Sequence, residues 1–184
     1  SETEVLNFAV KGESIASGAI HADNVAPCLF GGFVLIRDYN PIDVIKLPVP
    51  KNLYCTVLYS QIVIETKQAR KLIKKNLPLK KARKHFGNIG TLVSGLYESD
   101  LSKIGRSIED EISEPARASL IPNFYNIKDP ALSSGAYGCS ISGSGPSIFA
   151  FSDSESNAKK IGSAMKKIVN KTGIKSTLYI SKIN

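Results

Sequence analysis

Apolar residues recur at three- and four-residue intervals near the start of the chain. Leu6, Ala9 and Val10 fall on one face of a helix drawn through them. The pattern predicts an amphipathic helix over residues 2–17 that ends at Gly18. Such a face needs a partner to pack against, and no earlier segment of the sequence supplies one. We therefore expect the face to be adhesive or to pack in a homodimer.

Strands are predicted next, because short runs rich in β-branched and aromatic residues alternate with turn residues. A short helix over residues 24–30 comes first. Residues 32–39 and 43–49 are then predicted to form paired strands, and residues 53–60 a further strand.

The second part of the chain changes from helical patterns to a hairpin, a helix and a strand. Several helices are predicted over residues 66–136, with breaks near Pro78, Gly105 and Pro115 and across residues 122–130. The remaining elements are predicted at residues 139–142 and 147–151 for the hairpin, 154–171 for the helix and 176–183 for the strand. This order predicts an α+β fold with helices covering an antiparallel sheet, and its last part resembles a ferredoxin-like split unit.

Composition indicates a globular chain that can bury a core. It has 184 residues, 42% of them hydrophobic, and its longest apolar runs, such as residues 29–36, are far too short to span a bilayer. The N-terminus lacks the order of a signal peptide. The chain has three cysteines, which lie far apart in the sequence, so we interpret them as reduced thiols of a cytoplasmic protein. His21 and His85 are too distant in sequence for a zinc site.

The net charge is +8, and much of it lies in residues 67–86. That segment is predicted to form the charged faces of two helices broken near Pro78. A solvated surface explains such a run, and so does a face that binds nucleic acid. Nucleic-acid faces interleave aromatic residues or glycines with the basic ones, and this segment has only Phe86 at its end. We therefore expect a solvated surface and no nucleic-acid partner, with a nucleic-acid-binding domain that uses residues 67–86 as an alternative. The short apolar runs predict no membrane partner.

The stretch Gly143-Ser144-Gly145-Pro146 lies between two short apolar runs. A phosphate-binding P-loop needs its glycines to open a helix and a lysine to reach the phosphates, whereas a strand pattern follows here. The stretch is therefore not a P-loop. Two glycines with a proline serve a tight turn, so we predict the turn of a β-hairpin.

Several motifs resemble one enzyme family, in the family's order and over most of the chain. They are ISGSGP at 141–146, GESIASGAIHADNVAPCLFGGFVLI at 12–36, ETKQAR at 65–70, the run at 87–124 that contains EPAR, and GAYGCSISGSGPSIFAF at 135–151. The first resembles the third signature of the GHMP kinase superfamily, and the set is similar to the homoserine kinases within it. The resemblance implies transfer of the γ-phosphate of ATP, with Mg²⁺, to the side-chain hydroxyl of L-homoserine in threonine biosynthesis.

Homoserine is a small zwitterion with one alcohol, so its site needs a cation, an anion and a polar group. The resemblance implies that Arg70 and Arg117 bind the carboxylate, and a planar guanidinium can hold both of its oxygens. It also implies that Asp23 pairs with the ammonium. Asn24 would hydrogen-bond the acceptor hydroxyl, which makes it the expected catalytic residue. Without the resemblance, Asp23 and Asn24 would be interpreted as a helix cap.

The resemblance further implies that His21 and Thr66 line the amino-acid pocket and that Glu13 coordinates Mg²⁺. Magnesium prefers oxygen ligands and needs only one or two carboxylates beside phosphates and water. Glu13 would otherwise be interpreted as a solvated side chain. No general base is assigned, because phosphoryl transfer depends mostly on positioning and charge neutralisation. The third signature supplies a loop expected beside the phosphates, made of Ser142, Gly143, Ser144 and Gly145.

The main phosphate-binding element of the superfamily, a loop of the form PxxxGLGSS that opens a helix, does not occur in the sequence. We expect the chain to be the C-terminal portion of the enzyme and inactive alone. Residues 1–45 would be a remnant of the N-terminal domain, and residues 46–184 the C-terminal domain. Two alternatives stay open: a non-catalytic module that senses an amino acid through Arg70, Arg117 and Asp23, and a GHMP kinase for another small alcohol.

Overall fold

The computed structural model describes residues 1–17 and 20–184. The chain divides into two compact units, and each is described by itself. The first unit comprises residues 1–49 and 183–184, and the second comprises residues 50–182. The predicted helix end at Gly18 lies outside the described residues.

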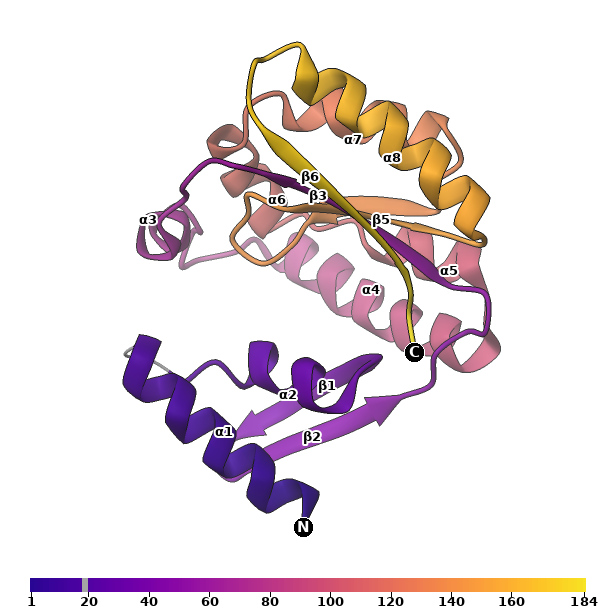
Figure 1. Ribbon diagram of the computed structural model, residues 1–184. Helices are drawn as coiled ribbons and strands as arrows, with labels where there is room; N and C mark the ends of the chain where they lie inside the picture. The colour runs from indigo at the N-terminus through magenta and orange to yellow at the C-terminus, as the bar shows by residue number, and fades with distance from the viewer. Residues whose placement is uncertain (18–19) are drawn as a thin grey trace. The chain divides into compact units, whose positions relative to one another are not determined.

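The first unit consists of two helices packed on a β-hairpin (Figure 1). Its elements are α1 (Glu2–Ser17), α2 (Ala22–Phe30), β1 (Phe33–Tyr39) and β2 (Ile42–Leu47). The strands β1 and β2 are antiparallel neighbours, as predicted. The helix α2 contacts both α1 and the hairpin, so it forms the middle of this unit.

The predicted apolar face of α1 is only partly the buried face. Leu6 and Val10 are buried against Ala22 and Ala26 of α2. Ala9, which the sequence spacing places beside them, is exposed. The stripe that α1 buries is narrow, and residues at the margin of that stripe stay in solvent.

The second unit is built on a four-stranded antiparallel sheet. Its strands are β3 (Tyr54–Ser60), β4 (Gly138–Ile141), β5 (Ile148–Ser152) and β6 (Ser176–Lys182), in the order β4-β5-β3-β6. The central strands are therefore β3 and β5. This is the helix-covered antiparallel sheet that the sequence predicts, with the predicted hairpin of β4 and β5 confirmed.

Two helices, α7 (Phe124–Ser133) and α8 (Glu155–Asn170), cover one face of this sheet (Figure 1). Ser154 caps α8 by accepting a hydrogen bond from the backbone N–H of Asn157, which is why the helix begins close to the predicted residue. The core between these helices and the sheet contains Leu58, Ile127, Ile148, Ile161 and Met165. The apolar residues of α8 recur at three- and four-residue spacing and form one stripe, so the sequence alone predicts this helix.

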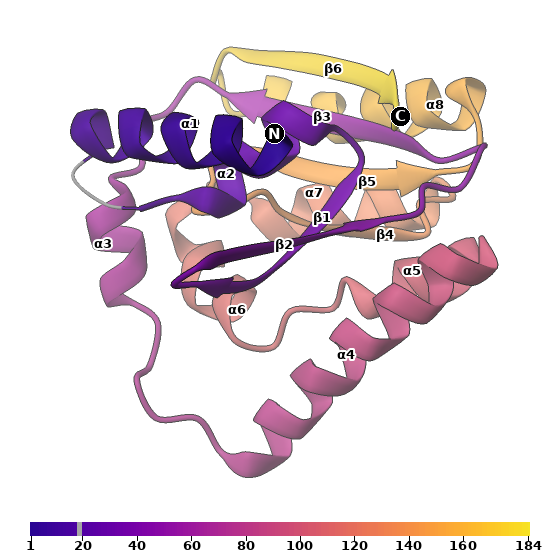
Figure 2. The same cartoon turned by 90° about the horizontal axis from the view of Figure 1, so that it is seen from below.

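The remaining helices lie between β3 and β4 in the chain. They are α3 (Thr66–Lys71), α4 (Leu79–Glu98), α5 (Leu101–Ser107), α6 (Ser113–Arg117) and a 3₁₀ turn, η1 (Ala118–Leu120). The helices α4 and α5 pack against each other (Figure 2). The basic residues of 67–86 are exposed, and Lys84 forms ion pairs with Glu109 and Glu111.

The predicted breaks near Gly105 and Pro115 are displaced: α5 ends at Ser107 and α6 begins at Ser113, so the break lies between these two residues. The predicted break across residues 122–130 is shorter than expected, because α7 begins at Phe124 and includes Pro130. Pro115 is tolerated because it occupies the first turn of its helix, where the backbone N–H groups have no intrahelical partner. The break near Pro78 is confirmed, since α4 begins at Leu79 directly after it. No helix among the described residues is both long and apolar enough to cross a membrane.

Gly105 is required by close packing of α5 against the strand β4. A Cβ atom at this position would lie 2.0 Å from the carbonyl oxygen of Tyr137. We expect Gly105→Ala to reduce the free energy of unfolding by about 3 kcal/mol or more, because the backbone must move to accept the methyl group. Urea unfolding followed by circular dichroism measures the change.

Gly90→Ala is the matched control, because Gly90 also lies inside a helix, but a methyl group at this position would meet no atom within 4 Å. It should increase the free energy of unfolding by up to about 1 kcal/mol through helix propensity. Equal effects of the two substitutions would contradict the close approach of α5 and β4.

Candidate active site

The HADN segment forms the start of α2 in the first unit. His21 occupies the N-cap position and makes no side-chain capping bond, while its backbone carbonyl accepts from the N–H groups of Asn24 and Val25. Asp23 and Asn24 lie in the first turn and are exposed. The cap position therefore belongs to His21, and neither Asp23 nor Asn24 is the N-cap residue of this helix.

A pocket of about 370 Å³ lies between α1 and α2 and brings two of the predicted residues together. Glu13 from α1 and Asn24 from α2 both line it. The other lining residues are Ala9, Val25, Cys28 and Leu29. One carboxylate and one amide thus face an otherwise small and apolar wall.

Asp23 lies beside Tyr39, the last residue of β1. Burial of the phenol, and then the negative charge of Asp23, raise the pKa of Tyr39 above its ordinary value. The position of Asp23 is therefore near the end of the β-hairpin, still within the first unit.

Glu13 and Asn24 fit the residue types that a magnesium ion uses. Both offer hard oxygen atoms, and Mg²⁺ commonly takes one or two protein carboxylates and completes its shell with phosphates and water. Within residues 1–17 and 20–184, no group of three or more His, Cys, Asp or Glu side chains could hold a metal by itself. A metal here would need ligands from a bound nucleotide.

In the second unit, Arg117 lies against the loop that joins β4 to β5. Its Nη1 donates a hydrogen bond of 2.7 Å to the backbone carbonyl of Gly143. Its Nε is buried and has no hydrogen-bond partner among the described residues. A buried N–H without a partner is costly, so this guanidinium has an unused donor suited to an oxygen ligand.

The loop itself is the predicted hairpin turn. The N–H of Ser142 donates to the carbonyl of Ser147 at 2.8 Å, and the N–H of Gly145 donates to the carbonyl of Ser142 at 3.0 Å. Gly143 and Gly145 have φ of 58° and 85°, which side chains rarely allow. A Cβ on Gly145 would also lie 2.9 Å from Ile121 Cδ1.

Thr66 begins α3, and its Oγ1 lies 3.4 Å from the Oγ of Ser144. The structure thus brings Thr66, Arg117 and the loop of the third signature close to one another in the second unit. Arg70 lies one turn further along α3, is exposed, and forms no ion pair within the described part of the chain. Its head group is free to meet an anion.

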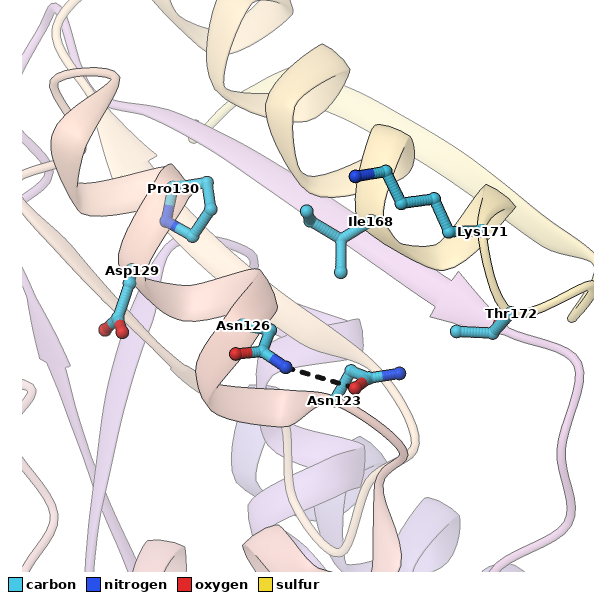
Figure 3. Close-up of a pocket in the computed structure, with 7 residues that line it drawn as sticks. All are labelled: Asn123, Asn126, Asp129, Pro130, Ile168, Lys171 and Thr172. Atoms are coloured by element: carbon cyan, nitrogen blue, oxygen red, sulfur yellow. Dashed lines mark hydrogen bonds between the residues drawn. The ribbon is translucent and has the colours of Figure 1, made fainter.

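A larger groove of about 520 Å³ lies elsewhere, between α7 and the end of α8 (Figure 3). Asn123 and Asn126 bond to each other across 3.1 Å, so these amides already have partners. Asp129 and Lys171 are contributed by different helical segments and form no ion pair within residues 1–17 and 20–184. None of the residues predicted from the sequence lines this groove, and we do not assign the chemistry to it.

Sequence reasoning named no role for Glu114, although it belongs to the EPAR motif. The structure buries this carboxylate and pairs it with Lys128 and Ser140. The burial of Glu114 would have indicated a role for this residue. Burial cannot be predicted from a motif of four residues.

The fold and the sequence define the class of protein. Residues 92–171 match the family model described as GHMP kinases C terminal. The chain superimposes on the crystal structure of L. major mevalonate kinase in complex with R-mevalonate with a TM-score of 0.77 at 18% identity, over all of this chain and 59% of that one, which shows a shared fold. Residues 92–171 are therefore similar to the C-terminal domain of the GHMP kinases, and the chain shares the fold of these proteins.

Homoserine kinases are among the relatives that match along the whole chain. The homoserine kinase of Chlorobium phaeobacteroides is 50% identical over 100% of this chain and 58% of that protein. The crystal structure of homoserine kinase from Cytophaga hutchinsonii has a TM-score of 0.97 and 53% identity, again over 100% of this chain and 58% of that one. The chain therefore spans somewhat more than half the length of the homoserine kinases to which it is homologous.

The pocket between α1 and α2 can be tested through Cys28, which lines it and is exposed. Burial raises the pKa of Cys55 to about 11 and that of Cys139 to about 12. Thiol reactions need the accessible thiolate, so at pH 8 an aromatic disulfide reagent should label Cys28 roughly 100-fold faster than the other two. Peptide mass spectrometry of the labelled protein measures the three rates.

Cys28→Ser should remove the fast phase and leave the slow ones unchanged. A compound that occupies the pocket beside Glu13 and Asn24 should slow the labelling of Cys28 alone. Fast labelling of Cys55 or Cys139 in the folded protein would contradict the burial of these thiols.

Proposed function

We propose that this chain is the C-terminal part of a homoserine kinase, which transfers the γ-phosphate of ATP to the side-chain hydroxyl of L-homoserine. The product would be O-phospho-L-homoserine, in threonine biosynthesis in the cytoplasm. The observation that carries the proposal is Arg117, whose guanidinium is fixed to Gly143 by one N–H while its buried Nε has no partner among the described residues. The identity with two homoserine kinases at 50% and 53% supports it.

Recognition of the zwitterion would use charges of both signs. Arg117 and Arg70 would bind the carboxylate, and Arg117 is the better fixed of the two. Asp23 would pair with the ammonium, and it is exposed at the start of α2. His21 and Thr66 would add polar groups that fix the orientation of the substrate.

Transfer of the phosphoryl group would depend on orientation and charge neutralisation. Asn24 would hold the acceptor hydroxyl by a hydrogen bond and direct it toward the phosphate. Glu13 would contribute one carboxylate to Mg²⁺, which, when bound, neutralises charge on the phosphates. No residue is proposed as general base.

The loop of Ser142, Gly143, Ser144 and Gly145 would form a wall beside the phosphates. It follows a strand and is closed by its own backbone bonds, so it lacks the aligned N–H groups of a helix N-terminus. The element that supplies such groups in GHMP kinases is absent from these residues. We therefore propose that residues 1–45 belong to an incomplete N-terminal domain and residues 46–184 to the C-terminal domain.

The substrate can be identified by release of ADP from the full-length protein, starting at its start codon, with ATP and Mg²⁺. We expect L-homoserine to stimulate release, and serine, mevalonate and galactose to give less than about 1% of its kcat/KM, because the site is built for a carboxylate and an ammonium. Stimulation by mevalonate or galactose instead would move the assignment to another GHMP kinase. Binding of homoserine without any turnover would indicate an amino-acid sensor.

The chain of 184 residues should release no ADP above background with the same substrates, because the phosphate-binding helix is absent from its sequence. The full-length protein, assayed in parallel, is the control. Turnover by the purified 184-residue chain at more than about 1% of the full-length rate would overturn this expectation.

A further inference from the structure

The second unit contains a buried carboxylate to which no role has been given. The side chain of Glu114 is 7% exposed, and that of its partner Lys128 is 16% exposed. Oε1 of Glu114 lies 2.5 Å from Nζ of Lys128, and Oε2 accepts a hydrogen bond of 2.7 Å from Oγ of Ser140. Both oxygens are therefore used, by one residue of α7 and one of β4.

This buried cluster is joined to the proposed substrate-binding group by a second bridge of the same kind. Glu114 bonds to Ser140, and Arg117, three residues later in α6, bonds to Gly143, three residues later along the β4 segment. Two parallel links thus hold α6 against β4 and the loop that follows it. We expect loss of one link to shift α6 and so to disturb the other.

The helix α6 cannot hold this position through its own stability. It has five residues, and Asp110 caps its start by accepting hydrogen bonds from the backbone N–H groups of Ile112 and Ser113 at 2.7 and 2.8 Å. Isolated helices of this length do not persist in water, so tertiary contacts must place it. The Glu114 cluster is the buried polar contact that ties α6 to both α7 and β4.

A buried ion pair seldom adds net stability, because removing two charges from water costs about as much as their attraction returns. Its best-attested use is to specify one arrangement over others. In this protein, we infer that the ion pair fixes the position of the Arg117 guanidinium against the loop at Gly143.

We propose that Glu114 is a positioning residue for substrate selectivity. By holding α6 against β4, it presents the guanidinium of Arg117 to the carboxylate of the amino-acid substrate. The inference rests on the proposed function, since it assumes that Arg117 binds that carboxylate. It adds that selectivity for a carboxylate-bearing alcohol depends on a residue that does not touch the substrate.

The test compares L-homoserine with 3-aminopropan-1-ol, which has the same alcohol and amine but no carboxylate. The variants Glu114→Gln and Ser140→Ala are made in the full-length enzyme. We expect each to raise KM for L-homoserine about tenfold or more, with kcat and KM for ATP changed less than about threefold. The inhibition constant of 3-aminopropan-1-ol should stay within about twofold of that of the unmodified enzyme, because the amino alcohol does not use Arg117.

Thr56→Val is the matched control. Thr56 is fully buried, and its Oγ1 donates to the carbonyl of Ala158 at 3.0 Å, so it is also a buried hydroxyl of the same sheet. It should lower the thermal unfolding midpoint without changing the preference for homoserine over the amino alcohol. Lys128→Arg keeps the charge and should retain most of the homoserine affinity.

The outcomes separate this inference from the proposed function. If the unmodified enzyme shows no turnover with homoserine, the proposed function fails. If it turns over homoserine, and both Ser140→Ala and Glu114→Gln lower the unfolding midpoint but leave KM unchanged, the positioning role is wrong. Should Glu114→Gln not fold, Ser140→Ala decides alone, because it removes one link without leaving an unpaired charge.

Discussion

The antiparallel pairing of β3 along both of its edges is the constraint on which the second unit depends. Val57, near the middle of β3, faces Phe149 of β5 on one side and Tyr179 of β6 on the other. These partners come from much later in the chain, so the sheet closes only when long loops have closed. The hairpin of β4 and β5, and with it the loop at Gly143, takes its place from this pairing.

The cost of burying polar groups explains the arrangement around Arg117. Glu114 is buried and has a partner for each of its oxygens, whereas Arg117 is left with a buried N–H that nothing in the described residues satisfies. The carboxylate of Glu114 therefore has all its hydrogen bonds within the fold, whereas the Nε–H of Arg117 has none in the part of the chain that the structure describes. That difference separates a residue that maintains structure from one suited to binding a ligand.

Much of the fold could be predicted because it follows from local patterns. The stripe of α8, the paired strands β1 and β2, and the turn at Gly143 and Gly145 all follow from periodicity or from the conformational range of glycine. The helix breaks were predicted less well. A glycine is needed at position 105 because the backbone of Tyr137, a residue distant in the sequence, approaches it closely. The sequence pattern around Gly105 does not indicate that contact.

The sequence by itself determined the types of element, their order, and the motif residues that carry charge and hydrogen-bonding groups. Only the tertiary structure decided that Leu6 and Val10 are buried while Ala9 is exposed, and that Glu114 meets Lys128 and Ser140. Periodicity depends on neighbours within one turn or one strand, so it can be read along the chain. Burial and pairing depend on which distant segments come together, and that is decided by the balance of packing against desolvation across the whole unit.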